Sequence, residues 1–408
     1  MVPGRGAERR GMIRQLFWLA SVFFTLNVAE TLNLPFANVF EKGLYLLLAG
    51  LVLVLRRVDP VAITLMIATL ILTIVLGLAT PFPKFSWATW LLSINQFAII
   101  YVLTGFHATR DDADGILRAT TWLPVICMIG GLIGLGLSGR PIWGIEYATG
   151  TMRLQGSQIP AFLSGLAANG IVASLILGLE WRRLRYLGFT AVNLIILILA
   201  GGRASLAVAM IASICVIVFS KVIHIRDKLM LLTGGLLALP FFAAIAVPFA
   251  LRRLATSTDN GRNAMAAYLQ TLVDQYSWTG IGFGHQYWQT PSDVVVLVGS
   301  AAAHNDYLRL TVELGAIGMI LFFIFMSIAM MRGAMRTGAI NWTVIAAWGG
   351  FLLNARSDNA LATPAYFPLL IVCMLPVAGG LGRAGSATPS TAADKPAPKG
   401  LAAAPATS

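Results

Sequence analysis

Charged side chains are scarce in this chain of 408 residues, in which Asp, Glu, Lys and Arg together make up only 11%. Soluble proteins carry about a quarter. Hydrophobic residues make up 57% of the chain, and the mean hydropathy is +0.78. This balance excludes a soluble globular protein and predicts an integral membrane protein.

Cysteine and histidine are scarce too. Cys127, Cys215 and Cys373 lie within apolar runs, and none belongs to a C-x-x-C pair. This argues against a disulfide framework, and His285 and His304 have no Cys or further His nearby with which to form a zinc site. The sequence also has no P-loop and no dinucleotide-binding fingerprint. We therefore expect neither a metal nor a cofactor.

Long apolar runs dominate the chain. Because a bilayer core of about 30 Å requires about 20 apolar residues per helix, the sequence predicts twelve membrane spans: 12–29, 36–55, 60–80, 88–107, 119–138, 159–180, 187–202, 204–220, 229–250, 308–331, 340–354 and 360–380. The expected fold is an all-α polytopic membrane domain over residues 1–381. Residues 382–408 are rich in Ala, Pro, Ser and Thr and are predicted to form a disordered tail.

The basic residues predict an orientation. If the N-terminus is cytoplasmic, most of the 29 Lys and Arg residues fall on cytoplasmic segments, as the positive-inside rule requires. Both termini and the tail are then cytoplasmic. Most of the positive charge behind the net charge of +12 therefore sets the orientation and faces anionic lipid. No nucleic-acid partner is expected. A smaller basic set lies on the outer side: Lys84, Arg140, Arg153, Arg203, Arg252, Arg253, Arg262, Arg309 and Arg356.

Two outer segments are long, 139–158 and 251–307, and long loops in compact proteins often carry function. In the second segment, apolar residues recur at helical spacing from Arg262 to Tyr276, which predicts an amphipathic helix on the membrane surface. The glycines at 280, 282 and 284 follow. They indicate either a loop that lines a substrate cleft or a tight re-entry turn.

Polar residues gather around this segment. Asp306, Arg309 and Glu313 have i,i+3 and i,i+4 spacing, which favours a structural ion-pair cluster over a catalytic one. Arg203 follows two glycines that would let a ligand approach the backbone. A role in function is favoured for Arg203 over snorkelling to the interface.

Arginines at a membrane surface suit a diphosphate, because guanidinium is permanently charged and bidentate. A histidine among them, such as His304, suits proton transfer. The outer face therefore fits a lipid-linked diphosphate substrate, whose departing charge arginines would stabilise.

Several motifs resemble those of the O-antigen ligase and O-antigen polymerase superfamily of bacterial inner-membrane glycosyltransferases. The similarity lies in Gly201-Gly202-Arg203-Ala204-Ser205-Leu206-Ala207, in Asn260-Gly261-Arg262 with the segment 278–284, and in His304-Asn305 followed by Gly315 and Gly318. Met152-Arg153-Leu154-Gln155-Gly156 is a weaker match. The chain departs from the pattern at Gly202, where a serine often stands, and at Met319, where ligases usually have Gly, Thr or Tyr.

The resemblance implies a GT-C-like fold and metal-independent, inverting transfer of a glycan from undecaprenyl diphosphate at the periplasmic face. By position, Arg203, Arg262 and Arg153 would bind the diphosphate, and His304 would position or deprotonate the acceptor hydroxyl. Four further residues are possible supports of this site: Asn305, Asp306, Arg252 and Arg253.

The motifs do not separate the members of the superfamily. A ligase that uses lipid A-core as the acceptor is the first hypothesis, and a polymerase of O-antigen or exopolysaccharide with the same donor is the alternative. A transporter or flippase is less favoured, because it predicts charges near the bilayer midplane and an internal repeat. The sequence shows neither feature.

Overall fold

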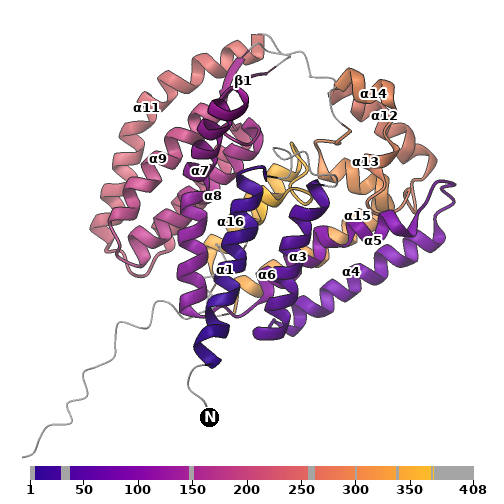
Figure 1. Ribbon diagram of the computed structural model, residues 1–408, viewed down its shortest axis with the longest axis horizontal. Helices are drawn as coiled ribbons and strands as arrows, with labels where there is room; N and C mark the ends of the chain where they lie inside the picture. Colours follow the sequence, from indigo (N-terminus) through magenta and orange to yellow (C-terminus); the bar gives the residue numbers. More distant parts are fainter. Residues whose placement is uncertain are drawn as a thin grey trace, which may run out of the picture.

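The computed structural model describes residues 5–28, 37–146, 151–255, 262–298, 301–336, 340–368 and 371. It is mostly helical (Figure 1). The elements are α1 (Arg5–Thr25), α3 (Ala37–Leu55), α4 (Pro60–Ala79), α5 (Trp87–Ser93), α6 (Asn95–Gly105), α7 (Arg110–Ser138), β1 (Trp143–Glu146), β2 (Thr151–Leu154), α8 (Pro160–Leu175), the π-helical turn η1 (Ile176–Glu180), α9 (Arg185–Ala200), α10 (Arg203–Phe219), α11 (Ile225–Ala255), α12 (Arg262–Gln275), α13 (Gln286–Gln289), α14 (Ser292–Val298), α15 (Asp306–Ala334), α16 (Trp342–Ala355) and the 3₁₀ turn η2 (Pro364–Tyr366).

Five segments in the described part of the chain are long and apolar enough to cross a bilayer: Pro60–Ala79, Trp87–Gly105, Arg110–Ser138, Pro160–Glu180 and Asp306–Ala334. Helices α9, α10 and α16 are apolar but shorter. An α-helical, multi-pass membrane protein is therefore supported, whereas the count of twelve spans stays a prediction. Most of the expected span 360–380, and the whole of the expected tail, lie outside the described residues.

Helix α8 lies at the centre of one group of helices, in contact with α7, α9 and α10 (Figure 1). In the apolar stretch Pro160–Glu180, which α8 forms together with η1, nearly all residues are buried. Small residues allow this close packing: a side chain at Gly165 would meet the Tyr366 ring, and one at Gly170 would meet Asn193. One polar group in this contact is paired, because the Asn169 amide donates to the Ala365 carbonyl over 2.7 Å.

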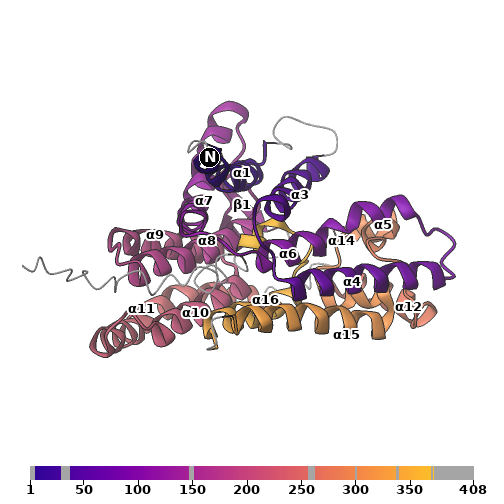
Figure 2. The same ribbon diagram turned by 90° about the horizontal axis from the view of Figure 1, so that it is seen from below.

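Figure 2 shows α4 and α15 running side by side along one half of the molecule, with α10 and α11 in the other half. Helices α1, α3 and α7 stand above them in this view. The ends of α3 and α7 are joined by Arg56, which binds both carboxylate oxygens of Asp112 over 2.8 and 3.0 Å.

Helix α15 is interrupted at Gly315, whose φ of 70° and ψ of 170° are not helical. The interruption removes hydrogen-bond donors from the carbonyls of Val312 and Glu313. The backbone N–H groups of Ile281 and Gly282 replace them over 2.8 and 3.0 Å. The segment before α13 therefore docks into the break in α15.

The glycines at 280, 282 and 284 all have positive φ, and residues 280–286 are buried. Of the two interpretations of these glycines, their burial and positive φ favour the tight turn. His285 follows them and is fully buried; its Nε2 accepts from the Ser86 N–H over 2.8 Å, and its ring stacks on Phe85. Burial lowers the pKa of His285, so this histidine is a neutral structural residue.

The structure adds one element to the expected fold and corrects one expectation. The first outer segment contains a short antiparallel hairpin of β1 and β2, with Gly144 opposite Arg153, within a fold that is otherwise helical. Helix α12 forms as expected, but Met265 and Leu269 are buried in a cluster with Val312 of α15. Its apolar face therefore packs on protein and not on the membrane surface, because α15 and α14 cover it.

Candidate functional site

The candidate site is built on the segment 356–368, which follows α16 and includes η2. Besides the hydrogen bond from Asn169 to Ala365, the Leu361 N–H donates to the Asp306 carboxylate over 2.9 Å. Within the segment, the Thr363 hydroxyl donates to the Asn359 carbonyl. These hydrogen bonds fix the segment between α8 and α15.

His304 lies directly before α15 and faces this segment. Its φ is +51°, in a region of backbone space that costs a non-glycine residue energy. The His304 Nδ1 is 3.7 Å from the Asp358 Oδ1. The His304 side chain remains 31% exposed, so a ligand can reach its ring.

Asp358 is mostly enclosed and makes three polar contacts. The Tyr366 hydroxyl donates to its Oδ2 over 2.8 Å, and the Asn359 N–H donates to its Oδ1 over 2.8 Å. Burial acts to raise the pKa of Asp358, but His304, Tyr366 and the Asn359 N–H stabilise the carboxylate and hold its pKa below the usual value. Asp358 is therefore an anion that can orient the His304 ring and stabilise its protonated form.

Asp306, Arg309 and Glu313 form the ion pairs that their spacing predicted. The Arg309 guanidinium contacts the Asp306 carboxylate over 2.7 Å and the Glu313 carboxylate over 3.3 Å, and all three side chains are buried. Arg309 also donates to Gln96, and Glu313 accepts from the Gln286 N–H. This cluster joins α15 to the segment around Leu361 and to the turn before α13, so Asp306 supports the site without being exposed in it.

Asn305 caps α15. Its side-chain oxygen accepts from the N–H groups of Tyr307 and Leu308 over 3.0 and 3.2 Å. This cap fixes the position where α15 begins, two residues after His304.

Arg203 is the first residue of α10, and its side chain is exposed. Gly201 ends α9 with φ +67°, and a side chain at Gly202 would overlap Ser164 of α8. The two glycines are therefore required for the turn and its packing on α8. Within α10, the Ser205 hydroxyl lies 3.3 Å from that of Ser164.

Arg153 lies on β2 beside this turn. Its Nε donates to the Ala200 carbonyl at the end of α9 over 2.7 Å. A side chain at Gly201 would also meet Arg153. Arg153 is thus held against the turn that precedes Arg203.

The remaining predicted arginines are placed only by their backbone. Arg252 and Arg253 lie near the end of α11, and Arg262 is the first residue of α12, but their side chains are not among those described. Their predicted contacts with substrate stay predictions.

Sequence reasoning missed Asp358 and Tyr366. Asp358 falls in a short outer turn between two expected spans, and Tyr366 within the last expected span. The only local indication of a functional residue was a carboxylate in a short outer turn, beside Asn359. Its pairing with His304 depends on contacts across 54 positions of the chain and could not be read locally.

Among the described residues, no three His, Cys, Asp or Glu side chains gather as a metal site would require. No family model and no curated protein matches the chain. The site is therefore interpreted from its own geometry.

Proposed function

We propose that this protein is a glycosyltransferase of the bacterial inner membrane that transfers a glycan from undecaprenyl diphosphate to an acceptor hydroxyl at the periplasmic face. The observation that carries the proposal is the accessible His304 ring beside the enclosed Asp358 carboxylate. A histidine oriented by a carboxylate is a general base of the kind that activates hydroxyl groups. The motif resemblance around Arg203, Arg262 and His304 supports the same reaction.

In the proposed reaction, the acceptor hydroxyl gives its proton to the Nε2 of His304, and Asp358 stabilises the resulting imidazolium. The acceptor oxygen forms a bond to the anomeric carbon from the face opposite the leaving group. The bond between that carbon and the diphosphate oxygen breaks, and undecaprenyl diphosphate leaves with the electron pair. Arg203, Arg262 and Arg153 would stabilise the departing charge. Inversion at the anomeric carbon follows from this single displacement.

The acceptor defines two versions of the function. In the first, the protein is an O-antigen ligase and the acceptor is lipid A-core. In the second, it is an O-antigen or exopolysaccharide polymerase, and the acceptor is another lipid-linked glycan. Met319, where the ligase pattern usually has a smaller or polar residue, favours the second version, whereas His304 with Asn305 and Gly315 favours the first.

A genetic experiment tests the site and separates the two versions. A strain that lacks the gene is complemented with the wild type, Arg203→Ala, His304→Ala, or the control Arg226→Ala, whose side chain is exposed at the start of α11. We expect surface glycan to be lost in the first two variants only. A ligase defect leaves long lipid-linked chains, and a polymerase defect leaves single repeat units. Normal glycan with correctly inserted His304→Ala would show the site assignment to be wrong.

A further inference from the structure

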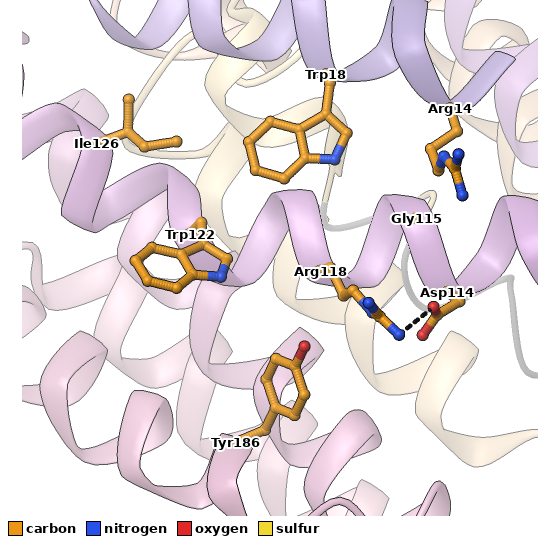
Figure 3. Close-up of a pocket in the computed structure, with 8 residues that line it drawn as sticks. All are labelled: Arg14, Trp18, Asp114, Gly115, Arg118, Trp122, Ile126 and Tyr186. Carbon is orange, nitrogen blue, oxygen red and sulfur yellow. Dashed lines mark ion pairs between the residues drawn. The ribbon is translucent and has the colours of Figure 1, made fainter. Parts of the chain in front are cut away.

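A second cavity, separate from the His304 site, lies between α1, α7 and α9. Its volume is about 450 Å³, and its walls include two tryptophans, a tyrosine, two arginines and an aspartate: Trp18, Trp122, Tyr186, Arg14, Arg118 and Asp114. Figure 3 shows Trp18 and Arg14 projecting from one helix toward Trp122 and Arg118 on the next, with Tyr186 across from them. None of these residues takes part in the proposed transfer.

The cavity has more positive than negative charge. Asp114 is paired with Arg118 over 2.6 Å and also with Arg183. Arg14 forms no ion pair with any residue that the structure describes, and it lies across Gly115, where any side chain would overlap it. The Nε of Arg118 is buried and has no hydrogen-bond partner among the residues that the structure describes. A buried donor without a partner is costly, so an anion with acceptor oxygens would complete this site.

The residues beside the cavity follow the same chemical order on both helices. Helices α1 and α7 run parallel here, because Arg14 lies over Gly115 and Leu26 lies beside Gly130 further along. Along α1 the order is Arg14, Trp18 and Val22, and along α7 it is Arg118, Trp122 and Ile126. Each helix passes from a cation to an indole and then to an aliphatic side chain.

This order matches the cross-section of a lipid leaflet, where basic residues meet headgroups and tryptophans lie at the interface. Beyond the cavity, α7 continues with the exposed apolar residues Ile129, Leu132 and Ile133, and Leu19 is exposed on α1. These positions offer a surface for an acyl chain. Free phosphate would use the arginines alone and would gain nothing from this apolar continuation.

We propose that the cavity binds the headgroup of an anionic phospholipid, with its phosphodiester between Arg14 and Arg118 and its acyl chains along Trp18, Trp122 and the exposed face of α7. The positive-inside prediction puts this site on the cytoplasmic leaflet, where anionic lipids provide binding partners for basic pockets between helices. The proposal is independent of the glycosyltransferase function.

The test measures quenching of tryptophan fluorescence by phosphatidylglycerol that is brominated on its acyl chains, titrated into the purified full-length protein in detergent. We expect saturable quenching that is weaker for brominated phosphatidylcholine. In Arg14→Gln/Arg118→Gln the affinity should fall about 30-fold, since each basic residue near an anionic lipid contributes about fivefold. The matched control Arg226→Gln, at an exposed arginine away from the cavity, should bind as the wild type does.

A second variant locates the lipid without removing charge. Trp18→Phe/Trp122→Phe should lose the saturable part of the quenching, whereas the amount of radiolabelled phosphatidylglycerol that it binds, measured directly, should give the wild-type affinity. Equal binding of the two lipid classes, or unchanged affinity in the folded arginine variant, would overturn the proposal. Displacement of the brominated lipid by millimolar inorganic phosphate would show that the site takes free phosphate instead.

Discussion

The break in α15 gives a sharp prediction for Gly315→Ala. With φ of 70° and ψ of 170°, Gly315 occupies a region of backbone space that is essentially restricted to glycine. A Cβ at this position would overlap the Trp278 carbonyl. The substitution therefore has to strain the backbone or expel the docked turn.

The magnitude follows from the contacts at the break. Backbone strain at such a position costs about 1–3 kcal/mol. Expelling the turn would disrupt three backbone hydrogen bonds, from Ile281 to Val312, from Gly282 to Glu313 and from Ala316 to Ser277. At about 1 kcal/mol each, these add about 3 kcal/mol. Because strain and expulsion of the turn are alternatives, we expect a loss of about 3 kcal/mol.

The assay is thermal unfolding of the purified protein in detergent. At about 2 °C per kcal/mol, the melting temperature of Gly315→Ala should fall by about 6 °C. Gly134→Ala in α7 and Gly349→Ala in α16 are matched controls, since no neighbouring atom lies within 4 Å of an added Cβ. These should change stability by less than about 1 kcal/mol, in the stabilising direction. A melting temperature for Gly315→Ala equal to those of the controls would refute the account of the break.

Three further predictions concern individual charges. Asp358→Asn should slow glycan transfer by about 100-fold or more while the protein still inserts, measured as product formed per inserted protein. Because the pKa of Asp358 is lowered in the fold, the carboxylate stabilises the fold at neutral pH, and this stabilisation is lost as pH falls below about 4. The melting temperatures of wild type and variant should therefore converge below that pH. His285→Phe removes the acceptor for the Ser86 N–H and should lower the free energy of unfolding by about 1–3 kcal/mol. Burial lowers the pKa of His285, so below about pH 6.5 the unfolded wild type takes up a proton that the folded protein does not. The melting temperature of the wild type, unlike that of the variant, should therefore fall from that pH downward. Arg56→Ala leaves the buried Asp112 carboxylate without its cation and should lower stability by about 3 kcal/mol, whereas an unchanged melting temperature would show that Thr109 alone satisfies it.

The sequence predicted features that depend on local spacing. The ion pairs of Arg309 with Asp306 and Glu313 follow from their positions on one helical face, and the structure contains both. Helix α12 was likewise predicted from apolar spacing. Its apolar face was assigned to lipid because the sequence does not show that Val312 of α15 comes to lie against it.

Features that depend on long-range contacts could not be predicted. The site needs Asp358 from one end of α16 and His304 from before α15, and no periodicity connects them. The interruption at Gly315 becomes visible only when the turn around Gly282 supplies the missing hydrogen-bond donors. The hairpin at Arg153 was missed since strands of four residues give too little alternation to be recognised.

The central claim is that His304 acts as the base in glycan transfer from a lipid diphosphate. The most direct measurement uses the purified protein with an undecaprenyl-diphosphate-linked glycan and a lipid acceptor, and follows the release of undecaprenyl diphosphate together with the glycosylated acceptor. The account predicts transfer by the wild type and by Arg226→Ala, and a loss of at least about 100-fold in His304→Ala. Transfer by His304→Ala at the wild-type rate, or movement of the intact donor across the membrane without any transfer by the wild type, would contradict it.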